Sequence, residues 1–97
     1  MNYEMKVKIT DPHTPEGMTS ELFFDLTCTF AYNEKQYGNG HYLVIKGKGF
    51  EPKHFDLRYD MSLIREGKEK WLEKWARSWW SGKNGAWTIK SLEITKI

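Results

Sequence analysis

Side chains capable of acid-base chemistry occupy alternate positions from His54 to Asp60. Two carboxylates, Asp56 and Asp60, flank the guanidinium of Arg58. If this stretch is a strand, these side chains share one face, where they could clamp a substrate or exchange protons with it. Charges of opposite sign on an exposed strand also neutralise one another and contribute little to stability. The sequence favours this second interpretation, a solvated charged row, over a catalytic site on the open face of a sheet.

The histidines do not form a metal-binding pattern. His13 lies in a proline-rich segment, His41 precedes an apolar run, and His54 belongs to the charged row. None lies at ligand spacing from another, and the lone cysteine, Cys28, cannot supply a paired-cysteine zinc motif. Glycine-lysine segments lack the spacing of a phosphate-binding loop, and the serines lack a nucleophile elbow. We therefore expect no metal and no other cofactor.

Lysines near aromatic residues suggest a different kind of site. Lys46, Lys48 and Lys53 fall on one predicted hairpin, and Arg58 follows it. Cations beside aromatic rings are the groups that bind single-stranded nucleic acids. Acidic residues are interleaved with these cations, however, and 15 basic against 13 acidic residues leave a net charge of only +2. The sequence therefore predicts no more than weak binding to nucleic acid.

Alternating apolar residues predict the strands that would carry these groups. The alternation covers Tyr3–Ile9, Leu22–Tyr32, Tyr42–Phe50 and Phe55–Met61. A loop rich in proline and glycine is expected at Asp11–Gly17, and a turn at Glu51–Lys53.

The second and third predicted strands are separated by Asn39-Gly40, a dipeptide typical of two-residue hairpin turns. A turn at this point would pair Phe30 with Gly49 and Tyr32 with Gly47, so that each ring covers a glycine. In the same strand Cys28 falls on the inward face, where we expect it to be a small buried hydrophobe that reacts slowly with thiol reagents.

A tryptophan-rich helix is predicted to begin between Ser62 and Lys68 and to end near Ser81, with Gly82 as a left-handed C-cap. Its apolar arc contains a row at spacings of four, for which we expect burial against the sheet: Trp71, Trp75 and Trp79. Trp80 lies at the rim of this arc and should be the most exposed tryptophan of the helix.

A last strand is predicted from Ala86 to about Thr95. Its inward set changes phase, from Trp87 and Ile89 to Leu92 and Ile94, which predicts a β-bulge near Lys90-Ser91.

These elements predict one α+β domain over residues 1–97. It should have two layers, with a mainly antiparallel sheet of about five strands and one tryptophan-rich helix packed on one face, in the order β-β-β-β-α-β. No signal peptide or membrane-spanning run is visible, and one cysteine favours a reducing compartment. We therefore expect a cytoplasmic protein.

The C-terminal part of the chain resembles a group of small proteins. The segments that carry the resemblance are Leu57-Arg58-Tyr59-Asp60, a short tryptophan-containing helix, and Trp80-Ser81-Gly82-Lys83-Asn84-Gly85-Ala86-Trp87. Together they are similar to small uncharacterised proteins of phages and mobile elements of Gram-positive bacteria. The resemblance covers roughly the last 40 residues. It implies a protein that binds and redirects or blocks a host protein, such as a defence nuclease, and it transfers no catalytic residue.

The sequence thus favours a non-enzymatic module that binds another protein. The expected interaction surface comprises Lys46, Lys48, Lys53, Asp56, Arg58 and Trp80. A nucleic-acid-binding protein that uses the basic hairpin is the alternative, and a small enzyme with a site on the open sheet face comes third. The oligomeric state is left open.

Overall fold

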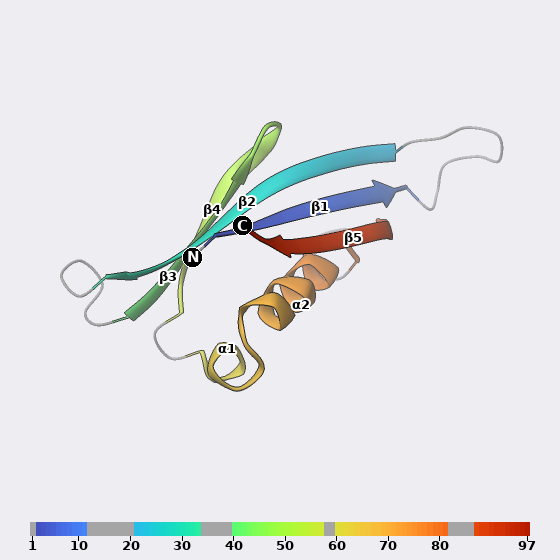
Figure 1. Cartoon of the computed structure of the whole chain (residues 1–97). Coiled ribbons are helices and arrows are strands. Elements are labelled where there is room, and N and C mark those ends of the chain that lie inside the picture. The colour runs from blue at the N-terminus through green and yellow to red at the C-terminus, as the bar shows by residue number, and fades with distance from the viewer. Residues whose placement is uncertain (1, 12–20, 34–39, 58–59, 82–86) are drawn as a thin grey trace.

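The chain forms a five-stranded antiparallel sheet with a long helix on one face (Figure 1). A computed structural model describes residues 2–11, 21–33, 40–57, 60–81 and 87–97. The elements are β1 (Asn2–Thr10), β2 (Glu21–Asn33), β3 (Gly40–Gly47), β4 (Phe50–Asp56), α1 (Met61–Glu66), α2 (Lys68–Ser81) and β5 (Thr88–Lys96). The strand order is β4-β3-β2-β1-β5, so β4 and β5 are the edges. The predicted fold class is confirmed, and the short helix α1 precedes the tryptophan-rich helix α2.

The core lies between α2 and one face of the sheet. Its buried side chains are Tyr3, Met5, Val7, Ile9, Leu26, Cys28, Phe30, Leu43, Ile45, Leu57, Leu63, Leu72, Ala76 and Trp80. The strand members occupy alternate positions, as the predicted period of two requires. Among the described residues, no helix is long and apolar enough to span a membrane.

The predicted register between β2 and β3 is wrong. Phe30 pairs with Leu43, and Leu26 pairs with Gly47. The pairing already ends at Asn33 and Gly40, so Gly40 belongs to the ladder and not to a two-residue turn. The shift between the predicted and observed registers is an even number of residues, so every side chain keeps its face. The hydrophobic pattern therefore fits both registers equally well.

Gly47 faces a crowded position in this register. A Cβ atom on Gly47 would lie 2.6 Å from the carbonyl oxygen of Asp25 and 2.7 Å from Cδ2 of Leu26. Only glycine lets the two strands approach this closely.

The fourth strand lies earlier in the chain than predicted. The turn after β3 falls at Lys48 and Gly49, where Gly49 has a φ of 73°. Pro52, placed in a turn by the sequence, instead lies within β4. An edge strand tolerates proline because one side of its backbone has no partner. β4 ends at Asp56, so Asp60 is not part of it.

Two helices replace the single predicted one because Gly67 separates them. Gly67 adopts a φ of 92°, which favours glycine, and its N–H donates to the carbonyl oxygen of Leu63 at 3.0 Å. Its own carbonyl accepts from the Trp71 N–H at 3.1 Å, so α2 begins directly after it. The predicted glycine cap after α2, Gly82, lies outside the described residues.

The predicted bulge in the last strand is confirmed. Lys8 pairs with Ser91 and Ile9 pairs with Ile89, so Lys90 is the extra residue on β5. Leu92 and Ile94 then face the same side of the sheet as Ile89.

The predicted exposure of the helix tryptophans is wrong in its order. Trp80 is buried, with 5% of its surface exposed, whereas Trp71, Trp75 and Trp79 are only partly buried. The Trp80 ring lies against the rings of Phe24, Phe50 and Trp75, at centroid distances of 5.7, 6.0 and 5.7 Å. A helical projection shows the direction of a side chain but cannot show that rings from β2 and β4 cover it.

We expect Trp80→Ala to lower the free energy of unfolding by about 3–5 kcal/mol, because it removes a large, fully packed indole. Trp79→Ala is the matched control and should cost less, because that indole is partly exposed. Urea denaturation of both variants measures the difference. Equal losses would contradict the observed burial.

Cys28 should react with thiol reagents only as the protein unfolds. It is fully buried, and burial raises the pKa of its thiol to about 12, so almost no thiolate is present at neutral pH. The measurement is the labelling rate across a urea titration, which should follow the unfolding transition. Rapid labelling in the absence of urea would show that β2 is displaced from the core.

Candidate interaction surfaces

The residues predicted to form one interaction surface point in different directions. Lys53 pairs with Ile45, so it lies on the face that α2 covers, whereas Lys46 is the next residue along β3 and lies on the opposite face. Lys48 is exposed in the turn between the two strands. The predicted basic hairpin therefore divides its cations between both faces. Trp80, also predicted for this surface, is buried.

The predicted charged row does not extend to Asp60. His54 and Asp56 are exposed on the open face, where the Tyr42 hydroxyl and Nδ1 of His54 share a hydrogen bond. Asp60 instead caps α1, and Arg58 lies outside the described residues. The sequence signal failed here because it extended the strand past Asp56.

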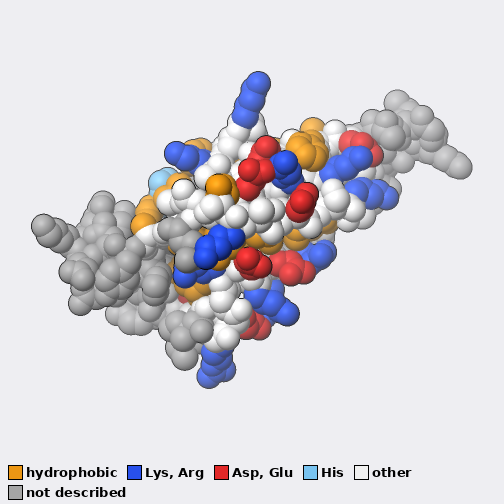
Figure 2. Space-filling model, in the orientation of Figure 1, with side chains coloured by type: hydrophobic (Ala, Val, Ile, Leu, Met, Phe, Trp, Pro, Cys, Tyr) orange, Lys and Arg blue, Asp and Glu red, His pale blue; other side chains and the backbone are white. Residues whose placement is uncertain are grey.

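The open face of the sheet carries charges of both signs. Lys6 pairs with Glu4 at 3.2 Å, and Lys8 pairs with Glu21 at 3.4 Å. Figure 2 shows acidic and basic side chains interspersed over the visible surface, without a large patch of one sign. Among the residues that the structure describes, no group of three or more histidines, cysteines or acids could hold a metal ion.

Partly buried aromatic rings form a surface between α2 and the edge strand β4. We call this surface the aromatic shelf and define it as Phe50, Phe55, Trp71, Trp75 and Trp79. Trp75 and Trp79 stack with centroids 5.8 Å apart, and Phe55 meets Trp71 at 5.5 Å. Phe50 contacts Trp75 at 6.3 Å. The rings support one another while each keeps some area exposed to solvent.

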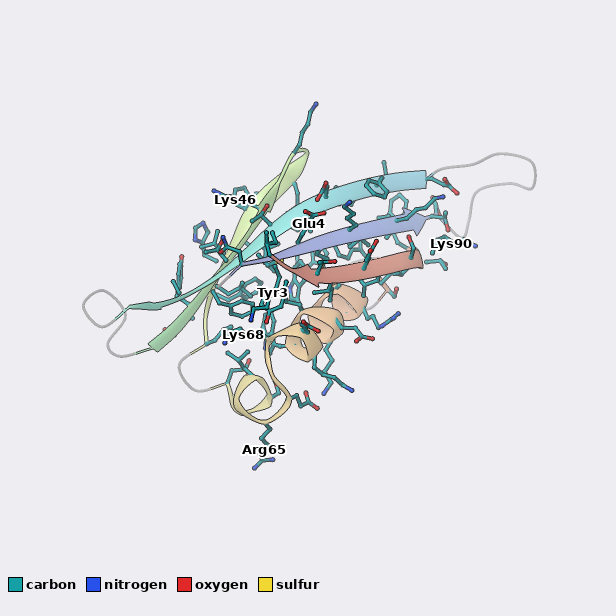
Figure 3. The ribbon with its side chains drawn as sticks, viewed as in Figure 1. Tyr3, Glu4, Lys46, Arg65, Lys68 and Lys90 are labelled. Carbon is teal, nitrogen blue, oxygen red and sulfur yellow. The ribbon has the colours of Figure 1, made fainter. Side chains whose placement is uncertain are left out.

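Lysines lie at the margin of the aromatic shelf. The Lys53 ammonium is 4.7 Å from the centroid of the Trp79 ring, a cation-π geometry. Its ion pair with Glu51 is long, at 3.9 Å, and the Glu51 side chain is 86% exposed. Lys68 is the first residue of α2, and its ammonium is 5.8 Å from the centroid of the Phe30 ring. Figure 3 shows Lys68 on the same side of the sheet as Tyr3 of β1.

Asp60 anchors one end of the aromatic shelf. Its Oδ2 accepts a hydrogen bond from the Trp71 indole N–H at 2.8 Å. Its Oδ1 accepts from the Leu63 N–H at 3.0 Å and from the Ser62 hydroxyl at 2.7 Å, as an N-cap of α1. Desolvation alone would raise the pKa of the Asp60 carboxyl. The hydrogen bonds to its charged form have the larger combined effect, so its pKa is lowered from the ordinary value. One carboxylate thus ties the start of α1 to the first indole of α2.

A groove lies on the other flank of α2, beside the edge strand β5. We call it the β5 groove; it has a volume of about 430 Å³ and is lined by Glu66, Glu69, Lys70, Glu73, Arg77, Leu92 and Ile94. Leu92 and Ile94 are partly buried and supply its apolar part, whereas the residues from α1 and α2 are charged. Its volume is in the range of ligand and peptide sites.

Two of the groove carboxylates already have partners. Glu66 accepts two hydrogen bonds at 2.6 Å from the Lys74 ammonium, and Glu73 pairs with Arg77 at 3.3 Å. Glu69 forms no ion pair within the described parts of the chain. Burial raises the pKa of the Tyr3 hydroxyl, and the negative charge of Glu69 raises it further.

Sequence reasoning missed both surfaces at the flanks of α2. The groove residues of α2 belong to the polar arc of the helix, which is typical of a solvated face. Both surfaces lie between α2 and an edge strand, so they could be found only from the order of the strands in the sheet. That order, with β4 and β5 at the edges, could not be read from the sequence. Comparison with models of protein families, with curated proteins and with solved structures finds no match to this chain.

Asp60→Asn should lower the free energy of unfolding by roughly 1 kcal/mol at pH 7, because the cap and the indole bond weaken. The folded-state pKa of Asp60 is lowered from its ordinary value of 3.8, so its stabilisation is complete above that value. It is lost as the pH falls through the folded-state pKa. The difference between wild type and variant should therefore shrink on acidification below about pH 4.

Urea titrations at a series of pH values measure this difference. Asp56→Asn is the control, because Asp56 is an exposed acid at the end of a strand. A wild-type advantage that persists unchanged at pH 2 would contradict the role assigned to the carboxylate.

Proposed function

We propose that this chain is a non-enzymatic protein-interaction module that binds its partner through the aromatic shelf. The observation that carries the proposal is the row Trp71, Trp75 and Trp79, held along one flank of α2 and left partly exposed. Tryptophan is enriched among the residues that dominate binding energy at protein interfaces, because a rigid indole buries a large area at little entropic cost. A surface of this type suits a partner with an apolar projection.

The margin of the aromatic shelf favours an acidic partner. Lys53 holds its ammonium over Trp79, and its ion pair with the highly exposed Glu51 is long. A partner carboxylate that displaces Glu51 would form a shorter pair in a partly desolvated position. Lys68 adds a second cation on the same side of the sheet. We therefore propose a folded partner protein that presents an apolar centre with an acidic rim.

The resemblance to small proteins of phages and mobile elements suggests the class of partner. Such proteins commonly act by binding a host protein, and a defence nuclease is one example. This part of the proposal rests on the resemblance and on the general suitability of a small rigid domain for blocking a larger protein. It makes the cytoplasm the expected place of action.

The nucleic-acid alternative has one observation in its favour, since a lysine beside a stacked pair of indoles can also hold a base. The division of Lys46 and Lys53 between two faces argues against it. A phosphate-tracking groove needs several cations on one side, and on the open face Lys6 and Lys8 are paired with carboxylates.

Capture from a native lysate with point variants tests the proposal. The immobilised chain should retain a protein partner after nuclease treatment, and mass spectrometry identifies that partner for titration in purified form. Trp79→Ala should weaken the purified complex by about 30-fold or more, as expected for an interface hot spot. Lys53→Glu should also weaken it, because the change places a carboxylate against an acidic rim.

Lys46→Glu is the matched control, because it makes the same charge change in the same hairpin on the opposite face. It should leave the affinity unchanged. Recovery of nucleic acid alone, or equal effects of Lys46→Glu and Lys53→Glu, would contradict binding through the aromatic shelf.

A further inference from the structure

The outer edge of β5 has backbone groups available for another strand. Among the described strands, β5 pairs only with β1, and the Ile97 N–H donates to the carbonyl oxygen of Asn2 at 2.9 Å. In an antiparallel ladder, residues that bond to the neighbouring strand alternate with residues that do not. Counting back from Ile97, Thr95 and Glu93 turn their backbone groups toward β1. Leu92, Ile94 and Lys96 therefore direct their N–H and C=O groups outward.

The same residues line the β5 groove. Leu92 and Ile94 place their side chains on the face covered by α2, where they form the apolar part of the groove. Directly opposed residues of an antiparallel pair project to the same face. A strand added to the edge would thus direct the side chains opposite Leu92 and Ile94 into the groove. One added strand could therefore pair with the open edge of β5 and fill the groove at the same time.

Within the described residues, two charged side chains of the groove, Glu69 and Lys70, have no ion pair. Glu66 is paired with Lys74 and Glu73 with Arg77, whereas no ion pair within the described residues includes Glu69. At 100° per residue, Glu69 lies about 60° around the helix from the buried Leu72, whereas Lys70 lies about 160° away on the outer side. The inner part of the groove is therefore acidic.

From this geometry we infer that β5 and its groove bind an extended segment of a partner protein, which adds to the sheet as a strand. The segment alternates residues in and out of the groove, with an apolar side chain over Leu92 and a basic side chain directed at Glu69. Strand addition of this kind takes affinity from main-chain hydrogen bonds and selectivity from alternate side-chain pockets. The site lies on the flank of α2 opposite the aromatic shelf and does not depend on the function proposed for the shelf.

β5 suits this role better than the other edge. β4 contains Pro52, which cannot donate to a ladder, and the rings of the aromatic shelf lie beside it. β5 has its bulge at Lys90, near its start, which leaves the segment from Ser91 to Lys96 in regular register with β1. An incoming strand thus meets an uninterrupted edge along the groove.

Amide exchange with two synthetic peptides tests the inference. The probes are acetylated and amidated seven-residue peptides, Thr-Val-Thr-Lys-Thr-Val-Thr and the same sequence with Glu in the centre, so that the second, fourth and sixth residues can face the groove. The Lys peptide should protect the amides of Leu92, Ile94 and Lys96 from exchange, as followed by NMR. The Glu peptide should bind about tenfold more weakly, because attraction to Glu69 becomes repulsion.

A charge-reversal variant distinguishes specific binding at Glu69 from non-specific binding of the peptide. Glu69→Lys should reverse the preference, so that the Glu peptide binds more tightly than the Lys peptide. Ile94→Pro removes an outward N–H without taking a bond from β1 and should abolish protection. Trp79→Ala and Lys46→Glu should leave peptide binding unchanged. The experiment can therefore fail for the aromatic shelf without failing for the β5 groove, and the reverse.

Several results would overturn the inference. These are the absence of protection on β5 at millimolar peptide, the same peptide preference in wild type and Glu69→Lys, and loss of peptide binding in Trp79→Ala. Protection of the β5 amides that rises with protein concentration without peptide would show instead that a second copy of the chain occupies the edge.

Discussion

One long helix, α2, covers most of one face of a five-stranded sheet, and this mismatch in width determines most of what the surface presents. Strands about 4.8 Å apart place the two outer strands roughly 19 Å from each other, whereas a helix with its side chains is about 10 Å wide. α2 lies beside β5, and its indoles extend across the rest of the face toward Phe50 and Phe55. Residues smaller than tryptophan would leave that half of the sheet uncovered. Packing against the sheet is thus sufficient to explain why α2 contains so many tryptophans, without reference to a binding partner.

The two flanks of α2 differ for the same reason. On the β4 side, large rings bridge the gap and keep part of their area exposed, which produces the aromatic shelf. On the β5 side, the polar arc of the helix turns toward Leu92 and Ile94 and leaves the groove. One edge is therefore aromatic with lysines at its margin. The other is apolar and lies beside the Glu69 carboxylate, which has no ion pair among the residues that the structure describes. The two proposed binding sites therefore differ in chemistry.

The elements could be predicted from the sequence, whereas their lateral arrangement could not. Alternation located β1 and β2, and the phase change in β5 located the bulge at Lys90. The pairing of Phe30 with Leu43 was missed because an even shift keeps every side chain on its face. The interaction surface was missed for a related reason. A two-residue turn at Lys48 and Gly49 alone would place Lys53 opposite Val44, on the same face as Lys46. The register shift between Ile45 and Gly47 instead pairs Lys53 with Ile45 on the other face, and no local signal marked that irregularity.

The position of the aromatic shelf is fixed by a polar contact at its end. Trp71 donates its indole N–H to Asp60, and the same carboxylate caps α1, so the junction around Gly67 and the first ring of the row are held together. Edge-to-face contacts of Phe55 with Trp71 and Trp75, and the stacking of Trp75 on Trp79, then carry this order from ring to ring. Rings already held in one rotamer lose little entropy when a partner covers them, which favours tight binding through a small area. A domain of 97 residues has little surface to offer, and preorganised indoles are an effective use of it.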